Sequence, residues 1–317
     1  MRYEIAMLVF TCLASCNGPK EEIILPGTIA YLGMSNPLSD GHDLFLYEDG
    51  VIERANLEKT GGAYYSTLSW FSPGSLLLIR QIVSQEKRSK VAGDPKRLVR
   101  SNLLIVNEQG FVKDTLYSSD LDQLINDSFS SPSGERIVFV LDKPRYGPQE
   151  PKTRASTIVI GEIQGEYNFK PLERIPVDET ISLYESPWSK QEDKIVYSSP
   201  SGVYIMNISD GKRNLVSSKG SYPVWSPAGD KIAFIENNDV WIYDLVSTGK
   251  SLFYRSKFAE GISRLHWSPM GIYLRVQGWR YTSFGYLFEK PIDRLLISDT
   301  GDEVTFNRVG GTSYTWR

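Results

Sequence analysis

The stretch SYPVWSPAGDKIAF, residues 221–234, joins a tryptophan, a Ser-Pro-x-Gly segment and a short apolar run. Proline fixes φ near the value that the second position of a type I turn requires, and glycine can adopt the positive φ that completes such a turn. Residues 231–235 are predicted to form a strand, because short apolar runs bounded by turn residues are typical of buried strands. The stretch therefore predicts an antiparallel β-hairpin whose first strand ends on Trp225.

Five further stretches repeat this phrase in part. The copy at residues 265–276 is almost complete, the fourth copy has lysine in place of the proline, and the first copy has no tryptophan. A fixed-order motif at a period of roughly 40–50 residues is typical of propellers and solenoids. The turn positions of the six copies, 37 to 59 residues apart, are Pro26, Pro73, Pro132, Lys190, Pro227 and Pro269.

Each copy is followed by further strand-like runs, such as residues 239–245 and 251–255, with a glycine or Asp-Gly turn before the last. Four antiparallel strands per repeat, six repeats and no helical periodicity predict an all-β fold, a six-bladed β-propeller of four-stranded antiparallel blades. The pattern YPVWSPAGDKIAF…DVWIYDL resembles the repeat of the TolB-type (WD-like) β-propeller family. We expect the repeated tryptophans to pack between blades rather than to contact a ligand.

The sequence leaves two ways to close the ring of blades. Residues 312–316, TSYTW, are similar to the segment GSYPVW at residues 220–225, and they would supply the inner strand that the first copy lacks. The alternative is that residues 22–25 form this strand and turn directly at Pro26. We favour closure by the C-terminal strand.

The N-terminus predicts a leader peptide. Arg2 precedes an apolar core at residues 5–14, which is too short to span a membrane as a helix but fits a signal peptide. Leu13-Ala14-Ser15-Cys16 resembles the lipobox of bacterial lipoproteins, which implies cleavage before Cys16 and lipidation of its thiol, with palmitate or similar chains. Such acylation exceeds the two-chain requirement for stable anchoring. The predicted organisation is a signal peptide at 1–15, a lipidated tether at 16–21 and a β-propeller domain at 22–317.

Two further observations bear on location. The only other cysteine, Cys12, lies in the predicted leader, so the mature domain has no thiol to pair and is stabilised by burial and ring closure. Asn17 follows Cys16, whereas aspartate at that place is the familiar inner-membrane retention signal of lipoproteins. We therefore expect an outer-membrane lipoprotein of the cell envelope, on the periplasmic side or exposed at the surface.

The chain lacks the common catalytic and nucleotide-binding motifs. It contains no Gly-x-Ser-x-Gly, no P-loop and no dinucleotide fingerprint, and only two histidines, His42 and His266. We expect His42 to lie in a turn and His266 to be a packed or hydrogen-bonded core residue. A net charge of −3 gives no case for nucleic acid. We therefore expect no enzyme, no cofactor and no metal; the alternative is a propeller lyase or hydrolase that acts on a polymer at the central axis.

Four loops between second and third strands are long, and they are predicted to emerge together on one face of the ring. Two of them are basic and the last is aromatic, and tryptophan, tyrosine and arginine are the usual anchors of interfaces. We predict a monomeric, lipid-anchored, non-catalytic binding or scaffold module for a protein or peptide, preferably acidic, or for a glycan. The candidate binding residues on these loops are Lys87, Arg88, Arg145, Arg154, Trp279, Arg280 and Tyr281.

Overall fold

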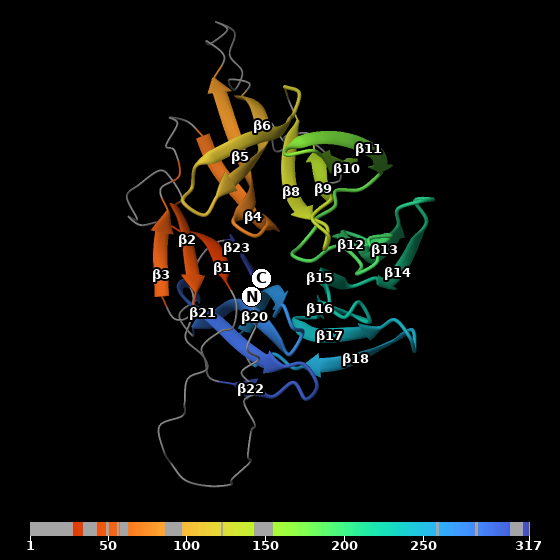
Figure 1. Cartoon of the computed structure of the whole chain (residues 1–317). Coiled ribbons are helices and arrows are strands. Elements are labelled where there is room, and N and C mark those ends of the chain that lie inside the picture. The colour runs from red at the N-terminus through yellow and green to blue at the C-terminus, as the bar shows by residue number, and fades with distance from the viewer. Residues whose placement is uncertain are drawn as a thin grey trace, which may run out of the picture.

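The chain forms six antiparallel sheets arranged radially about a central axis (Figure 1). A computed structural model describes residues 28–33, 43–48, 51–55, 57, 63–85, 97–121, 123–142, 155–257, 260–282, 285–304 and 313–316, and these residues contain strands and turns but no helix. The predicted all-β, six-bladed β-propeller is therefore confirmed.

Each sheet is one blade, and the blades are numbered in chain order. From the innermost strand outward, the strands are β23 (Ser313–Trp316), β1 (Ile29–Gly33), β2 (Asp43–Glu48) and β3 (Val51–Ala55) in blade 1; β4 (Ala63–Ser72), β5 (Ser75–Gln85), β6 (Arg97–Asn107) and β7 (Val112–Ser118) in blade 2; β8 (Leu124–Ser130), β9 (Arg136–Asp142), β10 (Ser156–Gln164) and β11 (Asn168–Val177) in blade 3; β12 (Lys194–Ser199), β13 (Gly202–Asn207) and β14 (Arg213–Ser217) in blade 4; β15 (Gly220–Trp225), β16 (Lys231–Glu236), β17 (Asp239–Asp244) and β18 (Gly249–Tyr254) in blade 5; and β19 (Glu260–Trp267), β20 (Tyr273–Thr282), β21 (Gly285–Ile297) and β22 (Glu303–Val304) in blade 6.

The ring is closed by the C-terminal strand. β23 pairs antiparallel with β1, with Trp316 opposite Ile29, and it also lies beside β4 of blade 2. The prediction of closure by the C-terminal strand is confirmed, and the alternative segment at 22–25 lies outside the described residues. Blade 1 is thus assembled from both ends of the chain, which ties the first and last blades together.

The hydrogen-bonded sheet of blade 4 has three strands, one fewer than the other blades. Its innermost segment makes only isolated bridges, Ser182 opposite Ser198 and Trp188 opposite Ile195. Pro187 cannot donate to a ladder and Ser186 has a φ of 57°, which interrupts regular pairing at this place. In β15 the same combination, Tyr222 with a φ of 54° before Pro223, coincides with a bulge in the ladder. The segment still occupies the inner position of the blade.

The turn between first and second strands has the same geometry in four blades. In blade 5, the Gly229 amide donates to the Ser226 carbonyl at 2.9 Å, and Gly229 has a φ of 80°. The Ser226 hydroxyl accepts a hydrogen bond from the Lys231 amide at 3.0 Å and donates to Asp230 at 2.8 Å. The serine therefore satisfies the first amide of the second strand, and the same contact, at 3.0 to 3.2 Å, is made by Ser131, Ser189 and Ser268.

The hydrophobic core lies between neighbouring blades. One cluster joins Phe129 of blade 3 to Trp188 of blade 4, and another joins Val224 of blade 5 to Trp267 of blade 6. Burial of such large side chains is the main stabilising contribution in a fold without disulfides. The interpretation of the repeated tryptophans as core residues is confirmed, because every one of Trp70, Trp188, Trp225 and Trp267 is less than 10% exposed.

Candidate binding pocket at the propeller axis

The ends of the innermost strands converge on a pocket at one end of the axis. Because turns between first and second strands from four different blades line it, three with Ser-Pro and one with Ser-Lys, these turns share one face of the ring, which we call the turn face. The pocket has a volume of about 310 Å³, near the lower limit of the roughly 300–1,000 Å³ typical of ligand sites. The lining residues are Ser69, Trp70, Phe129, Ser130, Ser131, Pro132, Glu185, Ser186, Trp188, Lys190, Trp225, Ser226, Pro227 and Pro269.

The exposed residues of the lining are Ser186, Lys190 and the three turn prolines, whereas Ser69, Ser131 and Ser226 are only 4%, 4% and 7% exposed. Trp70, Trp188 and Trp225 are only 9%, 3% and 3% exposed, so little of each indole reaches the pocket. Hydroxyl groups beside apolar rings can hydrogen-bond the backbone of an extended ligand while contacting its side chains.

Hydrogen bonds between blades fix the position of this wall. The Ser69 hydroxyl donates to the Ser128 carbonyl at 3.0 Å, from blade 2 to blade 3. Trp188 Nε1 donates to the Phe129 carbonyl at 3.2 Å, from blade 4 to blade 3. The backbone amide of Trp225 donates to the Ser186 carbonyl at 3.0 Å, from blade 5 to blade 4. The pocket is therefore preformed, which reduces the entropy lost on binding.

Two of the lining residues are ionisable, Glu185 and Lys190, and both belong to blade 4. Glu185 Oε2 is in hydrogen-bond contact with Nδ1 of His266, which is buried on β19. Burial, and next the positive charge of Arg275, hold the pKa of His266 well below its usual range. The ring is therefore neutral and donates its Nδ1 proton to the carboxylate. The predicted role of His266 as a hydrogen-bonded core residue is confirmed.

Arg275 carries the charge that lies next to His266. Its side chain is fully buried and forms a two-pronged ion pair with Asp293, with Nε to Oδ1 at 2.7 Å and Nη2 to Oδ2 at 2.5 Å. Because an arginine without a partner would be very unfavourable in such an environment, the pair keeps β20 and β21 in register. A polar layer thus runs from the pocket into blade 6.

A second titratable group lies on the innermost strand of blade 3. Asp127 accepts a hydrogen bond from the Leu183 amide at 3.1 Å. Burial, with a further contribution from the charge of Asp142, raises the pKa of Asp127 to about 7. Burial also raises the pKa of the nearby Tyr184 to about 12. Asp127 therefore changes its protonation state near neutral pH.

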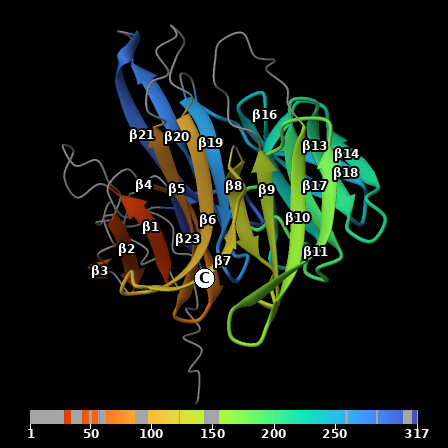
Figure 2. The same ribbon diagram turned by 90° about the horizontal axis from the view of Figure 1, so that it is seen from above.

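The predicted loop residues are only partly described. Lys87, Arg88, Arg145 and Arg154 lie outside the described residues, as does Cys16. Arg280 and Tyr281 lie on β20, where the structure describes their backbone alone, and Trp279, also on β20, is 45% exposed. β5, β6, β20 and β21 are second and third strands, so the end of β5 and the start of β6 lie opposite the turn face, as do the end of β20 and the start of β21. Strands β20 and β21 project at the top of the ring in Figure 2.

The sequence did not predict the axial pocket, because its lining residues were interpreted as turn and core residues. The available signal was the lysine that replaces proline at position 190. Within the described part of the chain, no group of three or more His, Cys, Asp or Glu could hold a metal ion. A search of the same residues for a helix long and apolar enough to cross a membrane found none.

Comparisons with known proteins agree with the fold. Residues 183–254, in blades 4 and 5, match the dipeptidyl peptidase IV N-terminal region, and no curated protein matches the chain. A putative TolB from Agrobacterium tumefaciens is 19% identical, with a TM-score of 0.51 over 76% of this chain and 79% of that one. A puromycin-hydrolyzing peptidase from Mycobacterium tuberculosis is 9% identical, with a TM-score of 0.56 over 87% of this chain and only 44% of the peptidase. The chain thus has the β-propeller fold of a TolB-like protein, as its repeats predicted.

Proposed function

We propose that this chain is a lipid-anchored, non-catalytic binding propeller of the bacterial cell envelope, and that its axial pocket holds an extended segment of a partner protein. The observation that carries the proposal is the preformed pocket where the innermost strands of the blades end. Its walls combine hydroxyl groups, prolines and the edges of buried aromatic rings, which suit a peptide backbone with small or apolar side chains.

A peptide fits this pocket better than a glycan. Sugar rings are usually bound by stacking on an open aromatic face, whereas the three lining tryptophans are at most 9% exposed. The exposed hydroxyl of Ser186 can instead accept from, and donate to, the amides and carbonyls of an extended chain, while the turn prolines contact its side chains. The partner class that the pocket favours is therefore a protein with a flexible segment.

Catalysis at the axis is the second candidate. Its acid–base pair would have to be Glu185 with His266, the contact that links the pocket to blade 6. Two features favour binding instead. The pair is largely buried, and the Ser69 hydroxyl donates to a backbone carbonyl rather than to a base. Serine nucleophiles need a base within hydrogen-bond reach.

Anchoring rests on the sequence alone. The lipobox that ends at Cys16 predicts a diacylated N-terminus, which would hold the propeller at a membrane surface. The Cys16→Ala variant should fail to incorporate labelled palmitate. Incorporation by this variant at the wild-type level would contradict the lipoprotein proposal.

Filling the pocket tests the binding proposal. Pro269 lines the pocket at a turn position where Lys190 shows that a non-proline residue is tolerated, and the neighbouring Met270 is 77% exposed and does not line it. Pro269→Trp should abolish capture of specific partners from detergent-solubilised envelopes, whereas Met270→Trp should leave it intact, with unchanged melting temperatures. Equal capture by both variants would contradict a role for the pocket.

A further inference from the structure

Lys190 interrupts the pseudo-symmetry of the pocket rim. The corresponding position is proline in the three other turns that line the pocket: Pro132, Pro227 and Pro269. The turn of blade 4 nevertheless has the usual geometry, because the Glu192 amide donates to the Ser189 carbonyl at 3.0 Å, as Gly229 does to Ser226 at 2.9 Å. The turn therefore does not need a lysine.

Packing uses only the aliphatic part of Lys190. Two of these turn positions, Lys190 and Pro227, lie against a glycine of the next blade: a Cβ placed on Gly271 would be 3.6 Å from Pro227, and one on Gly229 would be 2.8 Å from the Cβ of Lys190. The lysine stem thus replaces the proline ring. The ammonium group is additional, and it makes no ion pair or hydrogen bond with any residue that the structure describes.

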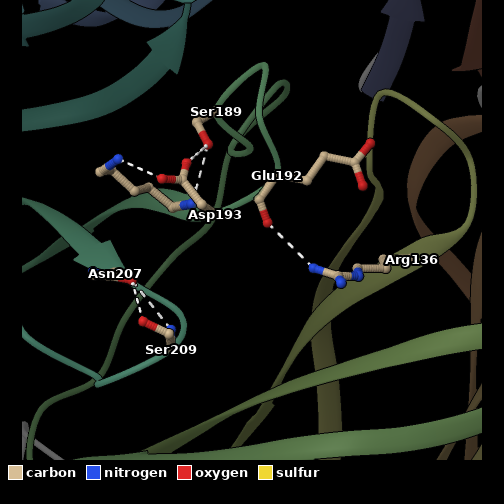
Figure 3. Close-up of polar contacts among 7 residues, drawn as sticks. Arg136, Ser189, Glu192, Asp193, Asn207 and Ser209 are labelled. Atoms are coloured by element: carbon tan, nitrogen blue, oxygen red, sulfur yellow. Dashed lines mark hydrogen bonds and ion pairs between the residues drawn. The ribbon is translucent and has the colours of Figure 1, made fainter.

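The acidic residues around Lys190 are engaged elsewhere. The carboxylate of Glu192 accepts hydrogen bonds from the Ser133 amide at 2.6 Å and the Ser133 hydroxyl at 3.1 Å. Asp193 pairs with Lys194 at 2.6 Å, and Glu185 contacts His266. Figure 3 shows Asp193 beside Ser189, while Glu192 extends toward blade 3. Lys190, which lines the pocket and is exposed, therefore has no counter-ion among these neighbours.

We propose that Lys190 is an anion subsite, and that the segment held in the axial pocket carries an Asp or Glu side chain that pairs with its ammonium group. This inference rests on the proposed function and adds its specificity: the partner segment is acidic at one position. A charge-assisted hydrogen bond is about twice as strong as a neutral one. The pocket walls displace water on one side, so the pair is less screened than a fully exposed one.

The test uses the full-length protein in detergent and a phage-displayed library of random dodecapeptides. One selected peptide and its Glu→Gln or Asp→Asn counterpart are then titrated against variants by fluorescence anisotropy. Lys190→Pro restores the residue of the other turns, so it removes the charge and keeps the packing. Lys212→Gln is the matched control, because Lys212 is exposed, belongs to the same blade, does not line the pocket and pairs with Asp210 at 3.2 Å.

Peptides selected by the wild type should be enriched in Asp or Glu at one position. Lys190→Pro should lower the affinity for the acidic peptide about tenfold or more and leave the affinity for its amide counterpart unchanged. It should also remove the salt dependence of binding. Lys212→Gln should change neither. If Lys190→Pro weakened both peptides equally, or Lys212→Gln acted like it, the subsite would be disproved while the pocket proposal stood. Peptides that bound the Pro269→Trp variant as tightly as the wild type would contradict the proposed function itself.

Discussion

Glu192 Oε1 accepts a hydrogen bond from the backbone amide of Ser133 at 2.6 Å, which joins the turns of blades 3 and 4. The Glu192 carbonyl also accepts from Arg136 Nη1 at 3.4 Å (Figure 3). Glu192 has a φ of 58° at a place where the equivalent turns of blades 3, 5 and 6 have glycine. A side chain in this left-handed conformation is strained by about 1 kcal/mol or more. The contact with blade 3 thus accompanies a local strain that glycine would relieve.

Two substitutions at Glu192 separate the contact from the strain. Glu192→Ala loses the hydrogen bonds between the carboxylate and Ser133 but keeps the strained φ. It should therefore lower the free energy of unfolding by about 1 kcal/mol. Glu192→Gly loses the same hydrogen bonds but relieves the strain, so its free energy of unfolding should be close to that of the wild type. Urea denaturation at one pH measures both. If the alanine variant were as stable as the wild type, the contact between blades would contribute nothing to stability.

The turn serines should contribute more to the stability of the fold than exposed serines do. Ser226 is 7% exposed and its hydroxyl accepts from the Lys231 amide, so Ser226→Ala should destabilise the protein by about 1–2 kcal/mol. Ser209→Ala is the control, because this hydroxyl is exposed and bonds to the side chain of Asn207, two residues away, at 3.0 Å. We expect the control to change stability by less than about 0.5 kcal/mol. Equal effects in thermal unfolding would contradict the structural role of the turn hydroxyl.

Stability should depend on pH through Asp127. Its pKa is raised from 3.8 to about 7 in the folded protein, so between pH 4 and 7 the folded state holds a proton that the unfolded state has released. Stability from this group is therefore present below pH 4 and is lost as the pH rises to about 7. Asp127→Asn cannot ionise, and its amide oxygen can still accept from Leu183.

The Asp127→Asn variant should match the wild type near pH 4 and exceed its stability by about 1 kcal/mol or more at pH 8. Denaturant midpoints measured at intervals across this range give the difference. Asp299→Asn, at an exposed turn position, is the control and should show no such divergence. A constant difference between Asp127→Asn and the wild type over the whole range would show that Asp127 does not titrate there.

The repeats made the fold predictable, because each copy encodes a hairpin locally. The C-terminal strand could be assigned because residues 313–316 are similar to an inner strand elsewhere in the chain. The irregular inner segment of blade 4 could not be predicted, because Pro187 interrupts the pairing there whereas Pro223 is accommodated within β15. The pocket could not be predicted, because it arises from side chains of five blades, between Ser69 and Pro269, that meet only when the ring closes.

The contributions of the two faces of the ring to partner binding can be tested separately. Trp279, 45% exposed on β20, lies on the hairpin opposite the turn face. If the predicted loop face anchors a partner, Trp279→Ala should weaken capture by more than about 1 kcal/mol without lowering the melting temperature, as truncation of an interface hot spot does. If the axial pocket holds the partner, Pro269→Trp should do so instead and Trp279→Ala should be neutral. Loss of capture in both variants would mean that the protein bridges two partners, one on each face. The two purified partners should then bind at the same time, without competing with each other.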